Sequence, residues 1–311
     1  MSAARYGWAF ALLAAGVVHA GCSRAALYAV TGGQTDGGES GPAPVSTGCG
    51  TTPLAPGDTS RTVQVGALSR SYVLHIPPAY DGATPAPLVV DFHGIGGTGA
   101  SERTASPYTA ALDPAGVVMA FPDGMKGPAG TAWNVGPCCV ADVDDVAFAR
   151  AVVADAGAAA CLAVDRVYAV GVLTGGGMAH YLACRAADVF AAVAPAAFDL
   201  LAENVDDCLP SRPISEVSFR GTADPRVPYD GGPSSLIPSM PVTFLGAQGT
   251  FSRWAEIDAC SGSPSTPDTN GCSRYTSCGA GVEVALCTKQ GGGDDPGDPA
   301  IAWPLLMRHT L

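Results

Sequence analysis

The chain has 311 residues, of which 47% are hydrophobic and only 14% are charged. That composition supplies enough apolar sequence for one large domain or two small ones, each with its own core. The formal net charge of −12 argues against nucleic acid and against anionic membrane surfaces as partners.

Residues 1–22 predict an export signal. Arg5 supplies a positive start, and residues 8–18 form an apolar run that is too short to span a bilayer securely. Cleavage after Ala20 would release a soluble protein, whereas lipidation of Cys22 would anchor it. Residues 23–48 are rich in Gly, Ser, Thr and Pro and predict a flexible tether. Because such tethers often follow a lipidated cysteine, we favour an exported cell-envelope lipoprotein over a secreted protein.

Beyond the tether, residues 61–77 alternate apolar and polar side chains around Gly66, which predicts an antiparallel hairpin at one sheet edge. Short, continuously apolar runs then predict strands that are covered on both faces. These runs are residues 88–92, 117–121, 166–172, 190–194, 214–219 and 282–286.

Helical segments lie between several of these strands. The clearest is 143–160, which opens with two aspartates that suit a helix N-terminus. Residues 176–185 and 299–309 are two more. Strands that alternate with helices predict an α/β fold with a mostly parallel, doubly wound sheet and an antiparallel N-terminal edge. We expect one domain over residues 49–311, without an internal repeat.

Cysteine usage agrees with export. Of the eleven cysteines, ten remain when Cys22 is set aside, enough for five disulfides in an oxidising compartment. A metal site is the alternative, but no CxxC pair and no Cys/His cluster has zinc spacing. We therefore predict structural disulfides, with their connectivity open, and no bound metal. The ten are Cys49, Cys138, Cys139, Cys161, Cys184, Cys208, Cys260, Cys272, Cys278 and Cys287.

Residues 167–184 read VYAVGVLTGGGMAHYLAC, a buried strand followed by a tight glycine turn and a helix. That order predicts a nucleophile elbow, in which small flanking residues let a strained turn lift a hydroxyl above the sheet. Gly171 and Gly175 stand where the glycines of G-x-S-x-G belong, but the residue between them is Leu173. A leucine side chain neither attacks a carbonyl nor loses a proton. Hydrolysis therefore depends on this one position.

Further motifs accompany the elbow from about Cys49 to the C-terminus. They are Arg70-Ser-Tyr-Val-Leu-His-Ile-Pro, Asp91-Phe-His-Gly-Ile-Gly-Gly, Trp133-Asn134 with Cys138-Cys139, Val143-Asp-Asp-Val-Ala-Phe, Gly221-Thr-Ala-Asp-Pro-Arg-Val-Pro-Tyr and Gly291-Gly-Gly. In this order and spacing they resemble secreted esterases, a family that includes polyhydroxybutyrate depolymerases and feruloyl esterases. The resemblance implies an α/β-hydrolase fold and carboxylic-ester hydrolysis by a serine, a histidine and an acid, without a cofactor.

The resemblance also implies an oxyanion hole in the loop that begins at His93. Glycines in such a loop let backbone N–H groups point at a developing negative charge. Gly94 and Ile95 would line the hole, and Thr174, the residue after the nucleophile's position, would add a donor. Taken alone, the loop fits an ordinary glycine-rich turn equally well.

The three catalytic positions are occupied unequally. Asp224 stands where the family keeps the acid that orients its histidine. Leu173 stands at the position of the nucleophile, and Asp294, just after the glycine run, stands at that of the histidine. The loop that follows Gly293 also looks shortened. The resemblance therefore implies a hydrolase scaffold that has lost two of its three catalytic groups.

Thr174 is the nearest hydroxyl that could replace the serine. It lies one step past the apex, its β-branch crowds the turn, and a threonine nucleophile needs an adjacent base. The histidines beyond the signal are His75, His93, His180 and His309, and none directly follows the last predicted strand.

Two other features have both a functional and a structural interpretation. Asp294, Asp295 and Asp298 could bind calcium, but a solvated acidic loop is favoured. Cys138-Cys139 could act in redox chemistry, but structural pairing at the rim of the site is favoured.

The leading hypothesis is an exported esterase-family protein that has lost hydrolysis and keeps a cleft for an ester or polyester-like small molecule. Esters of hydroxyalkanoates or hydroxycinnamates are examples. The alternatives are an active esterase that uses Thr174 or a rearranged site, and a decaying paralogue without a selected role. The sequence predicts contact with a membrane only through a lipid on Cys22. It makes no prediction of the oligomeric state.

Overall fold

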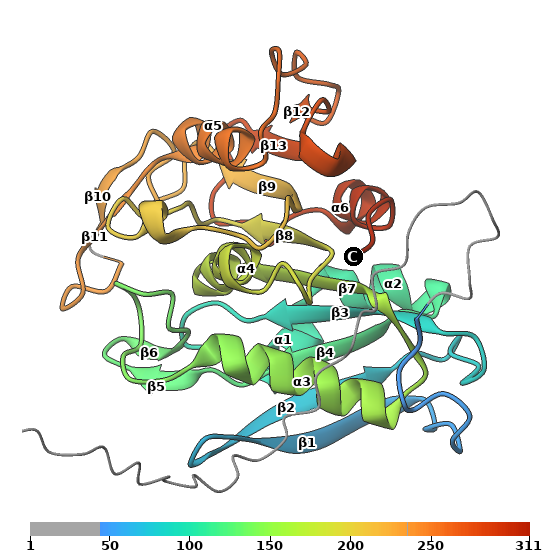
Figure 1. Ribbon diagram of the computed structural model, residues 1–311. Coiled ribbons are helices and arrows are strands. Elements are labelled where there is room, and N and C mark those ends of the chain that lie inside the picture. Colours follow the sequence, from blue (N-terminus) through green and yellow to red (C-terminus); the bar gives the residue numbers. More distant parts are fainter. Residues whose placement is uncertain (1–43, 235) are drawn as a thin grey trace, which may run out of the picture. The chain divides into compact units, whose positions relative to one another are not determined.

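The computed structural model describes residues 44–234 and 236–311, which are built around a nine-stranded sheet (Figure 1). The strands of this sheet are β1 (Gly57–Val65), β2 (Leu68–Ile76), β3 (Ala86–Phe92), β4 (Val118–Pro122), β7 (Leu162–Val172), β8 (Ala192–Ala196), β9 (Ser215–Gly221), β12 (Cys272–Tyr275) and β13 (Val284–Lys289). They lie in the order β1-β2-β4-β3-β7-β8-β9-β13-β12.

Helices and two short hairpins connect these strands. The helices of the described residues are α1 (Gly99–Ala105), α2 (Pro107–Leu112), α3 (Asp145–Ala159), α4 (Thr174–Arg185), α5 (Ala247–Ile257) and α6 (Pro299–Leu306), with single 3-10 turns at Asp113–Ala115, Val205–Asp207 and Gly279–Gly281. The hairpins are β5 (Met125–Gly127) with β6 (Gly130–Ala132), and β10 (Gly232–Ser234) with β11 (Val242–Phe244).

The sheet confirms the predicted fold class. The strands from β4 to β13 in the sheet order run parallel, and the hairpin of β1 and β2 forms the predicted antiparallel N-terminal edge. The opposite edge was not predicted, because β12 pairs antiparallel with β13. The four residues of β12 read CSRY and form no apolar run that could have marked them as a strand.

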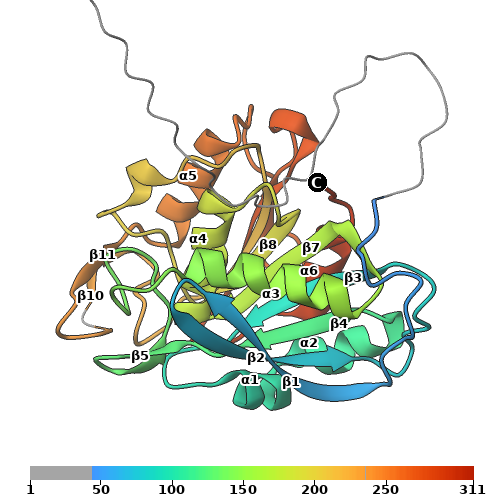
Figure 2. The same ribbon diagram turned by 60° about the horizontal axis from the view of Figure 1, so that its bottom comes forward.

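Apolar strands explain why helices cover both faces of the sheet. Every residue of β4 and β8 is buried, as are six of the seven in β3. Helices α3, α4 and α5 pack on one face, and α2 and α6 pack on the other. Figure 2 shows α3 and α4 on one side of the strands, with α1 and α2 on the other side. The two faces each bury their own apolar cluster.

The predicted helices 143–160, 176–185 and 299–309 correspond to α3, α4 and α6. Asp144 caps α3 by accepting a hydrogen bond from the Ala147 amide at 2.8 Å. Helix α4 begins two residues earlier than predicted, because the elbow leads into it without a linker. Helices α1 and α2 escaped prediction because they are only seven and six residues long.

The packed part of the chain begins slightly before residue 49, the predicted boundary. Val45 pairs with Ala163, and the Ser46 hydroxyl donates to the Ala160 carbonyl at 2.7 Å. Residues 44–48, which the composition assigns to the tether, therefore pack on β7. The predicted signal, Cys22 and the rest of the tether lie outside the described residues. Within the described residues, no helix has the length and apolar character needed to cross a membrane.

Ten cysteines form five disulfides, the number that the sequence predicts. The pairs are Cys49–Cys161, Cys138–Cys139, Cys184–Cys208, Cys260–Cys278 and Cys272–Cys287. Cys138 and Cys139 are bonded to each other and fully buried, which fits the structural interpretation of this pair. Disulfides in this number are consistent with an oxidising compartment.

Candidate functional site

The elbow that the sequence predicts is present, with Leu173 at its apex. Strand β7 ends at Val172 and α4 begins at Thr174, so Leu173 alone joins them. Its φ of 52° and ψ of −123° form a conformation that persists only where the surrounding fold enforces it. The Leu173 amide donates to the Ala196 carbonyl at 3.0 Å, and its carbonyl accepts from Gly177 at 2.9 Å. The strained turn is kept although its residue has no hydroxyl.

The two glycines of the elbow are sterically required. A Cβ on Gly175 would lie 1.8 Å from the Phe92 carbonyl oxygen. A Cβ on Gly171 would lie 2.6 Å from the backbone of Gly175. No larger residue fits at either position, so the motif holds the end of β7 and the start of α4 against β3.

The predicted oxyanion loop lies directly against the leucine. A Cβ on Gly94 would be 3.3 Å from Leu173 Cδ1 and 3.4 Å from Leu173 Cβ. The leucine is 8% exposed. Among the described residues, the amides of Ile95 and Thr174 have no hydrogen-bond acceptor. Thr174 is fully buried and Ile95 is partly exposed, so only the Ile95 amide belongs to a residue that reaches the surface.

His93 is a support of this loop and not a base. Its Nδ1 donates to the Gly94 carbonyl at 2.7 Å, and its Nε2 accepts from the Gly124 amide at 2.9 Å. These bonds assign the neutral tautomer, and burial lowers the pKa of His93 below its ordinary value. Trp133 Nε1 donates to the His93 carbonyl at 2.8 Å. Both ring nitrogens of His93 are occupied, so it has no free nitrogen for a substrate.

A buried ion pair lies close to the same loop. Arg70 Nη2 contacts Asp145 Oδ1 at 2.8 Å, and both side chains are at most 2% exposed. Asp145 Oδ2 accepts from the Asn134 amide at 2.7 Å, and Arg70 also donates to the Asp123 carbonyl at 3.0 Å. Burial raises the pKa of Asp145, and the Arg70 guanidinium opposes that shift. Three motifs that are distant in the sequence therefore meet in one network.

Asp224 follows β9 and is held by its own turn. Its Oδ1 accepts from the amides of Arg226 at 2.8 Å and Val227 at 2.9 Å. Its Oδ2 is buried and has no hydrogen-bond partner in the described part of the chain. In a triad, one oxygen of the acid accepts the Nδ1 proton of the histidine. The unpartnered oxygen is what removal of that histidine would leave.

A second buried pair fixes the turn that carries Asp224. Arg220 Nη2 donates to the Val227 carbonyl at 2.7 Å, and the Arg220 guanidinium also contacts the carboxylate of Asp199. Both side chains of this pair are fully buried. Burial raises the pKa of Asp199 to about 6, against the lowering effect of Arg220. A buried ion pair therefore stabilises the turn of Asp224, and another one lies next to the oxyanion loop.

Asp294 lies beside this turn, where the resemblance places the histidine. The Ala223 amide donates to the Gly292 carbonyl at 2.8 Å, which joins the glycine run to the acid turn. Asp294 Oδ2 contacts Arg226 Nη1 at 2.6 Å. The structure thus brings Asp294 and the turn of Asp224 together, and it gives Asp294 an arginine partner that the sequence analysis missed. The motif that contains Asp224 and Arg226 carries no signal of this contact.

The neighbouring acids do not form a metal site. Asp295 contacts Lys289 Nζ at 2.8 Å, and Asp298 caps α6 through the Ala300 amide at 2.8 Å. In the described ranges, no group of three or more His, Cys, Asp or Glu side chains could hold a metal ion. Asp295 and Asp298 thus take part in an ion pair and a helix cap.

Thr174 is the alternative nucleophile that the sequence offers. Its side chain is fully buried, and its hydroxyl has no hydrogen-bond partner among the residues that the structure describes. A threonine nucleophile needs a base within hydrogen-bond distance. Its surroundings therefore do not favour it as a replacement for the serine.

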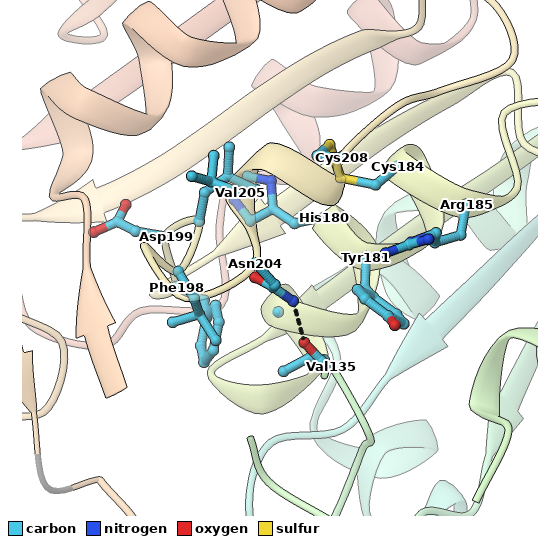
Figure 3. A pocket seen from close by; sticks show the side chains of 13 residues that line it. Val135, His180, Tyr181, Cys184, Arg185, Phe198, Asp199, Asn204, Val205 and Cys208 are labelled. Carbon is cyan, nitrogen blue, oxygen red and sulfur yellow. Dashed lines mark hydrogen bonds between the residues drawn. A yellow bond between two sulfur atoms is a disulfide. The ribbon is translucent and has the colours of Figure 1, made fainter. Parts of the chain in front are cut away.

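His180 is likewise a buried structural residue. Its Nδ1 accepts from Trp254 Nε1 at 3.1 Å, and burial lowers its pKa to about 3. It lines a cavity of about 20 Å³, which has space for little more than a water-sized group (Figure 3). Figure 3 shows the Cys184–Cys208 disulfide and the bond from Asn204 to the Val135 carbonyl around it.

A larger cavity of about 510 Å³ lies between the ends of β9 and β13 and the start of α6. Phe219, Lys289 and Ile301 are among its lining residues. Neither of these two cavities is lined by Leu173 or Asp224.

Comparison with known proteins identifies the family. No family model matches the chain. Feruloyl esterase B of Piromyces equi is 42% identical over 246 residues, which cover 78% of this chain and 46% of that protein. The chain belongs to a feruloyl esterase-like family of α/β-hydrolases. Feruloyl esterase C of Emericella nidulans is 31% identical over 195 residues, which cover 60% of this chain and 65% of that protein. The feruloyl esterase-like chain therefore spans less than two thirds of either relative.

Solved structures agree with this assignment at the level of the fold. The acetyl xylan esterase from Aspergillus awamori has a TM-score of 0.56 at 15% identity, over 80% of this chain and 99% of that one. The feruloyl esterase module from Clostridium thermocellum has a TM-score of 0.52 at 10% identity, over 80% of this chain and 85% of that one. The feruloyl esterase-like chain thus has the α/β-hydrolase fold that its sequence predicts.

Proposed function

We propose that this feruloyl esterase-like protein does not hydrolyse esters through a catalytic triad and that it binds an ester-like small molecule at the retained elbow. Leu173 is the observation that carries the proposal. It occupies the strained apex of the elbow, and its side chain lies against Gly94 of the oxyanion loop. A hydrocarbon side chain at this point supplies no nucleophile.

The residue at the expected position of the histidine supports the same proposal. In this proposal Asp294 takes the histidine's place and contacts Arg226, so no neutral base lies next to Asp224 within residues 44–234 and 236–311. In a triad hydrolase, loss of the nucleophile alone lowers kcat by about 10⁶, and loss of the base adds little because the groups act as a unit. Once the serine is gone, catalysis no longer keeps the histidine in place.

The retained amide of the oxyanion loop defines the ligand class of the proposal. The N–H group of the partly exposed Ile95 can donate to a carbonyl oxygen, while the side chains of Leu173 and Ile95 offer apolar contact. A small molecule with an ester carbonyl and an apolar body matches both. The relatives are named feruloyl esterases, so we extend the ligand class to esters of hydroxycinnamates, together with esters of hydroxyalkanoates.

We further propose that the protein is exported and carries a lipid on Cys22. The five disulfides support export, since they persist in oxidising compartments. The proposal that Cys22 carries a lipid is based on the sequence alone. Mass spectrometry of the mature N-terminus would separate a lipidated Cys22 from a chain cleaved after Ala20.

Hydrolysis is tested on the purified full chain with short p-nitrophenyl esters and with a fluorophosphonate that labels active serine hydrolases. We expect no turnover above the buffer rate and no labelling. The matched control is Thr174→Ala, which should leave the rate unchanged. Turnover that disappears in Thr174→Ala would overturn the proposal in favour of an esterase with a threonine nucleophile.

Binding is tested separately by titrating the same chain with methyl ferulate and with methyl 3-hydroxybutyrate in a calorimeter. We expect one of these esters to bind and to be recovered unchanged. Leu173→Glu should abolish binding, because its carboxylate would be repelled by an ester oxygen next to the Ile95 amide. Absence of binding by both esters would remove the ligand half of the proposal and leave the statement on hydrolysis intact.

A further inference from the structure

Residues 261–271 connect α5 to the edge strand β12 without a helix or a strand of their own. Within 261–270 every residue is exposed except the partly exposed Pro264. Two disulfides, Cys260–Cys278 and Cys272–Cys287, bracket the segment. Near the label of β12 in Figure 1, this part of the chain projects beyond α5 and β13. The disulfides fix its ends and leave its backbone accessible.

The segment is rich in hydroxyl side chains and proline. It reads SGSPSTPDTNG, with Pro264 and Pro267 directly after Ser263 and Thr266. A proline keeps the residue before it extended, and it withholds an amide from regular structure. The sequence therefore holds these hydroxyls in the open, extended backbone that a modifying enzyme requires.

Some hydroxyl groups of this segment form hydrogen bonds with the rest of the protein, and others do not. Ser261 donates to the Ser277 carbonyl at 3.2 Å, and the Ser265 hydroxyl accepts from the Arg274 amide at 3.1 Å. Among the described residues, the hydroxyls of Ser263, Thr266 and Thr269 form no hydrogen bond. Both residues that precede a proline therefore keep a free hydroxyl.

We propose that Ser263, Thr266 and Thr269 are acceptors for O-linked sugars. Segments rich in Ser, Thr and Pro are the ones that carry O-glycans on exported proteins. The donor would be a sugar whose anomeric carbon is linked to the phosphate of a nucleotide or a lipid. The side-chain oxygen attacks that carbon, the bond to the phosphate breaks, and the phosphate departs with the electron pair. The hydroxyl proton passes to a base of the transferase.

The modification also has a physical consequence for this segment. Exposed loop tips of small and polar residues are preferred sites of proteolysis. Sugars on the three free hydroxyls would cover the backbone between the two disulfides without entering the core. The segment lies apart from Leu173 and Asp224, so the inference does not depend on whether the site hydrolyses esters.

The test is mass spectrometry of the full chain purified after export by its own host. We expect the reduced peptide that contains residues 261–271 to exceed its sequence mass by whole sugar units. The triple variant Ser263→Ala, Thr266→Ala, Thr269→Ala should return to the sequence mass and be cut faster by protease in the native state. As a matched control, Thr59→Ala with Ser60→Ala removes exposed hydroxyls from the paired strand β1 and should change neither result. An unmodified peptide, or one that carries phosphate, would overturn the proposal.

Discussion

The two sides of the elbow have been kept to different degrees. On one side, the oxyanion loop rests on the Trp133 indole, a neutral His93 and the buried pair of Arg70 and Asp145. On the other side, the turn of Asp224 is held by its own hydrogen bonds, but the position that the resemblance assigns to the histidine carries an aspartate in a half-exposed ion pair. The difference shows which groups also serve the fold. Replacing the buried side chains that hold the loops would lower the stability of the fold. Replacing a nucleophile or a base that faces the substrate would not.

The largest expected effect is the return of hydrolysis in the double variant Leu173→Ser, Asp294→His. The elbow turn and the free amides of Ile95 and Thr174 are already in place, and Asp224 Oδ2 lacks a partner among the described residues. We expect esterase activity from the pair and almost none from either change alone, with up to about 10⁶ in kcat separating them. The readout is the rate with p-nitrophenyl acetate.

The control for this pair is a third change, Asp224→Asn. Loss of the acid oxygen leaves the histidine in the wrong tautomer, which lowers kcat by about 10⁴ in a triad hydrolase. A folded double variant that neither hydrolyses esters nor reacts with the fluorophosphonate would show that the loop after Gly293 holds the new histidine away from the elbow. The region around Asp224 and Asp294 would then differ from that of an active esterase in its backbone as well as in the Asp294 side chain.

The second prediction concerns the buried support of the oxyanion loop. Asp145→Ala leaves the Arg70 guanidinium buried without its carboxylate, so we expect a loss of about 3–5 kcal/mol in the free energy of unfolding. Urea titration measures this loss. The matched control is Asp188→Ala, which breaks a pair with Arg150 whose side chains are 36% and 54% exposed. The control should cost at most about 1 kcal/mol. Equal losses in the two variants would show that the oxyanion loop does not depend on its buried pair.

The third prediction concerns how the stability of the folded protein depends on pH. Burial raises the pKa of Glu216 on β9 to about 8 and that of Asp258 after α5 to about 7. A raised carboxyl pKa means that the folded state binds the proton more tightly, so the contribution of these two carboxyls to stability is fully present below about pH 4 and is lost as the pH rises to about 8. The lowered pKa of His93 acts in the opposite direction, because its contribution is present above 6.5 and lost as the pH falls.

Thermal unfolding between pH 5 and pH 8.5 measures the alkaline part of this profile. Glu216→Gln should flatten the fall in Tm above neutral pH, because a buried amide has no proton to lose. Glu256→Gln, a surface change with the Glu256 side chain 68% exposed, should leave the slope as it is. The same slope in all three proteins would mean that the buried carboxyls of β9 do not control alkaline stability.

Most of the sheet could be predicted from the sequence because its strands are continuously apolar. The strands from β3 to β13 in the parallel core match the six predicted runs, and the elbow motif placed Leu173 correctly at the turn. The edge strand β12 escaped because it has no apolar run, and α1 and α2 escaped because they are short. Helix α5 was missed although its buried residues Ala247, Phe251 and Trp254 have helical spacing. Their positions depend on packing against elements that are distant in the sequence.

The sequence motifs predicted where the residues of the candidate site lie in the fold, but not which side chains they contact. The motif that contains Asp224 predicted a turn after a strand, yet nothing in it showed that Arg226 would contact Asp294 across 68 residues of chain or that Arg220 would donate to Val227. Such contacts arise from the parallel pairing of β9 with β13, which brings the two loops together. Periodicity and motifs report local structure, and they do not report which charged side chains meet.

The smallest expected effect tests whether the remodelled ion pair has become part of the fold. Arg226 and Asp294 are 49% and 33% exposed, so solvent screens their attraction, and Arg226→Ala should cost at most about 1 kcal/mol. Arg220→Ala is the matched comparison on the same turn, and it should cost about 3–5 kcal/mol because it leaves Asp199 buried and unpaired. Urea titration of both variants gives the difference directly. If Arg226→Ala were as costly as Arg220→Ala, the pair at the histidine's position would be a structural support. Restoring a histidine there would then exchange stability for activity, and the fold would depend on the acid side as strongly as it depends on the oxyanion side.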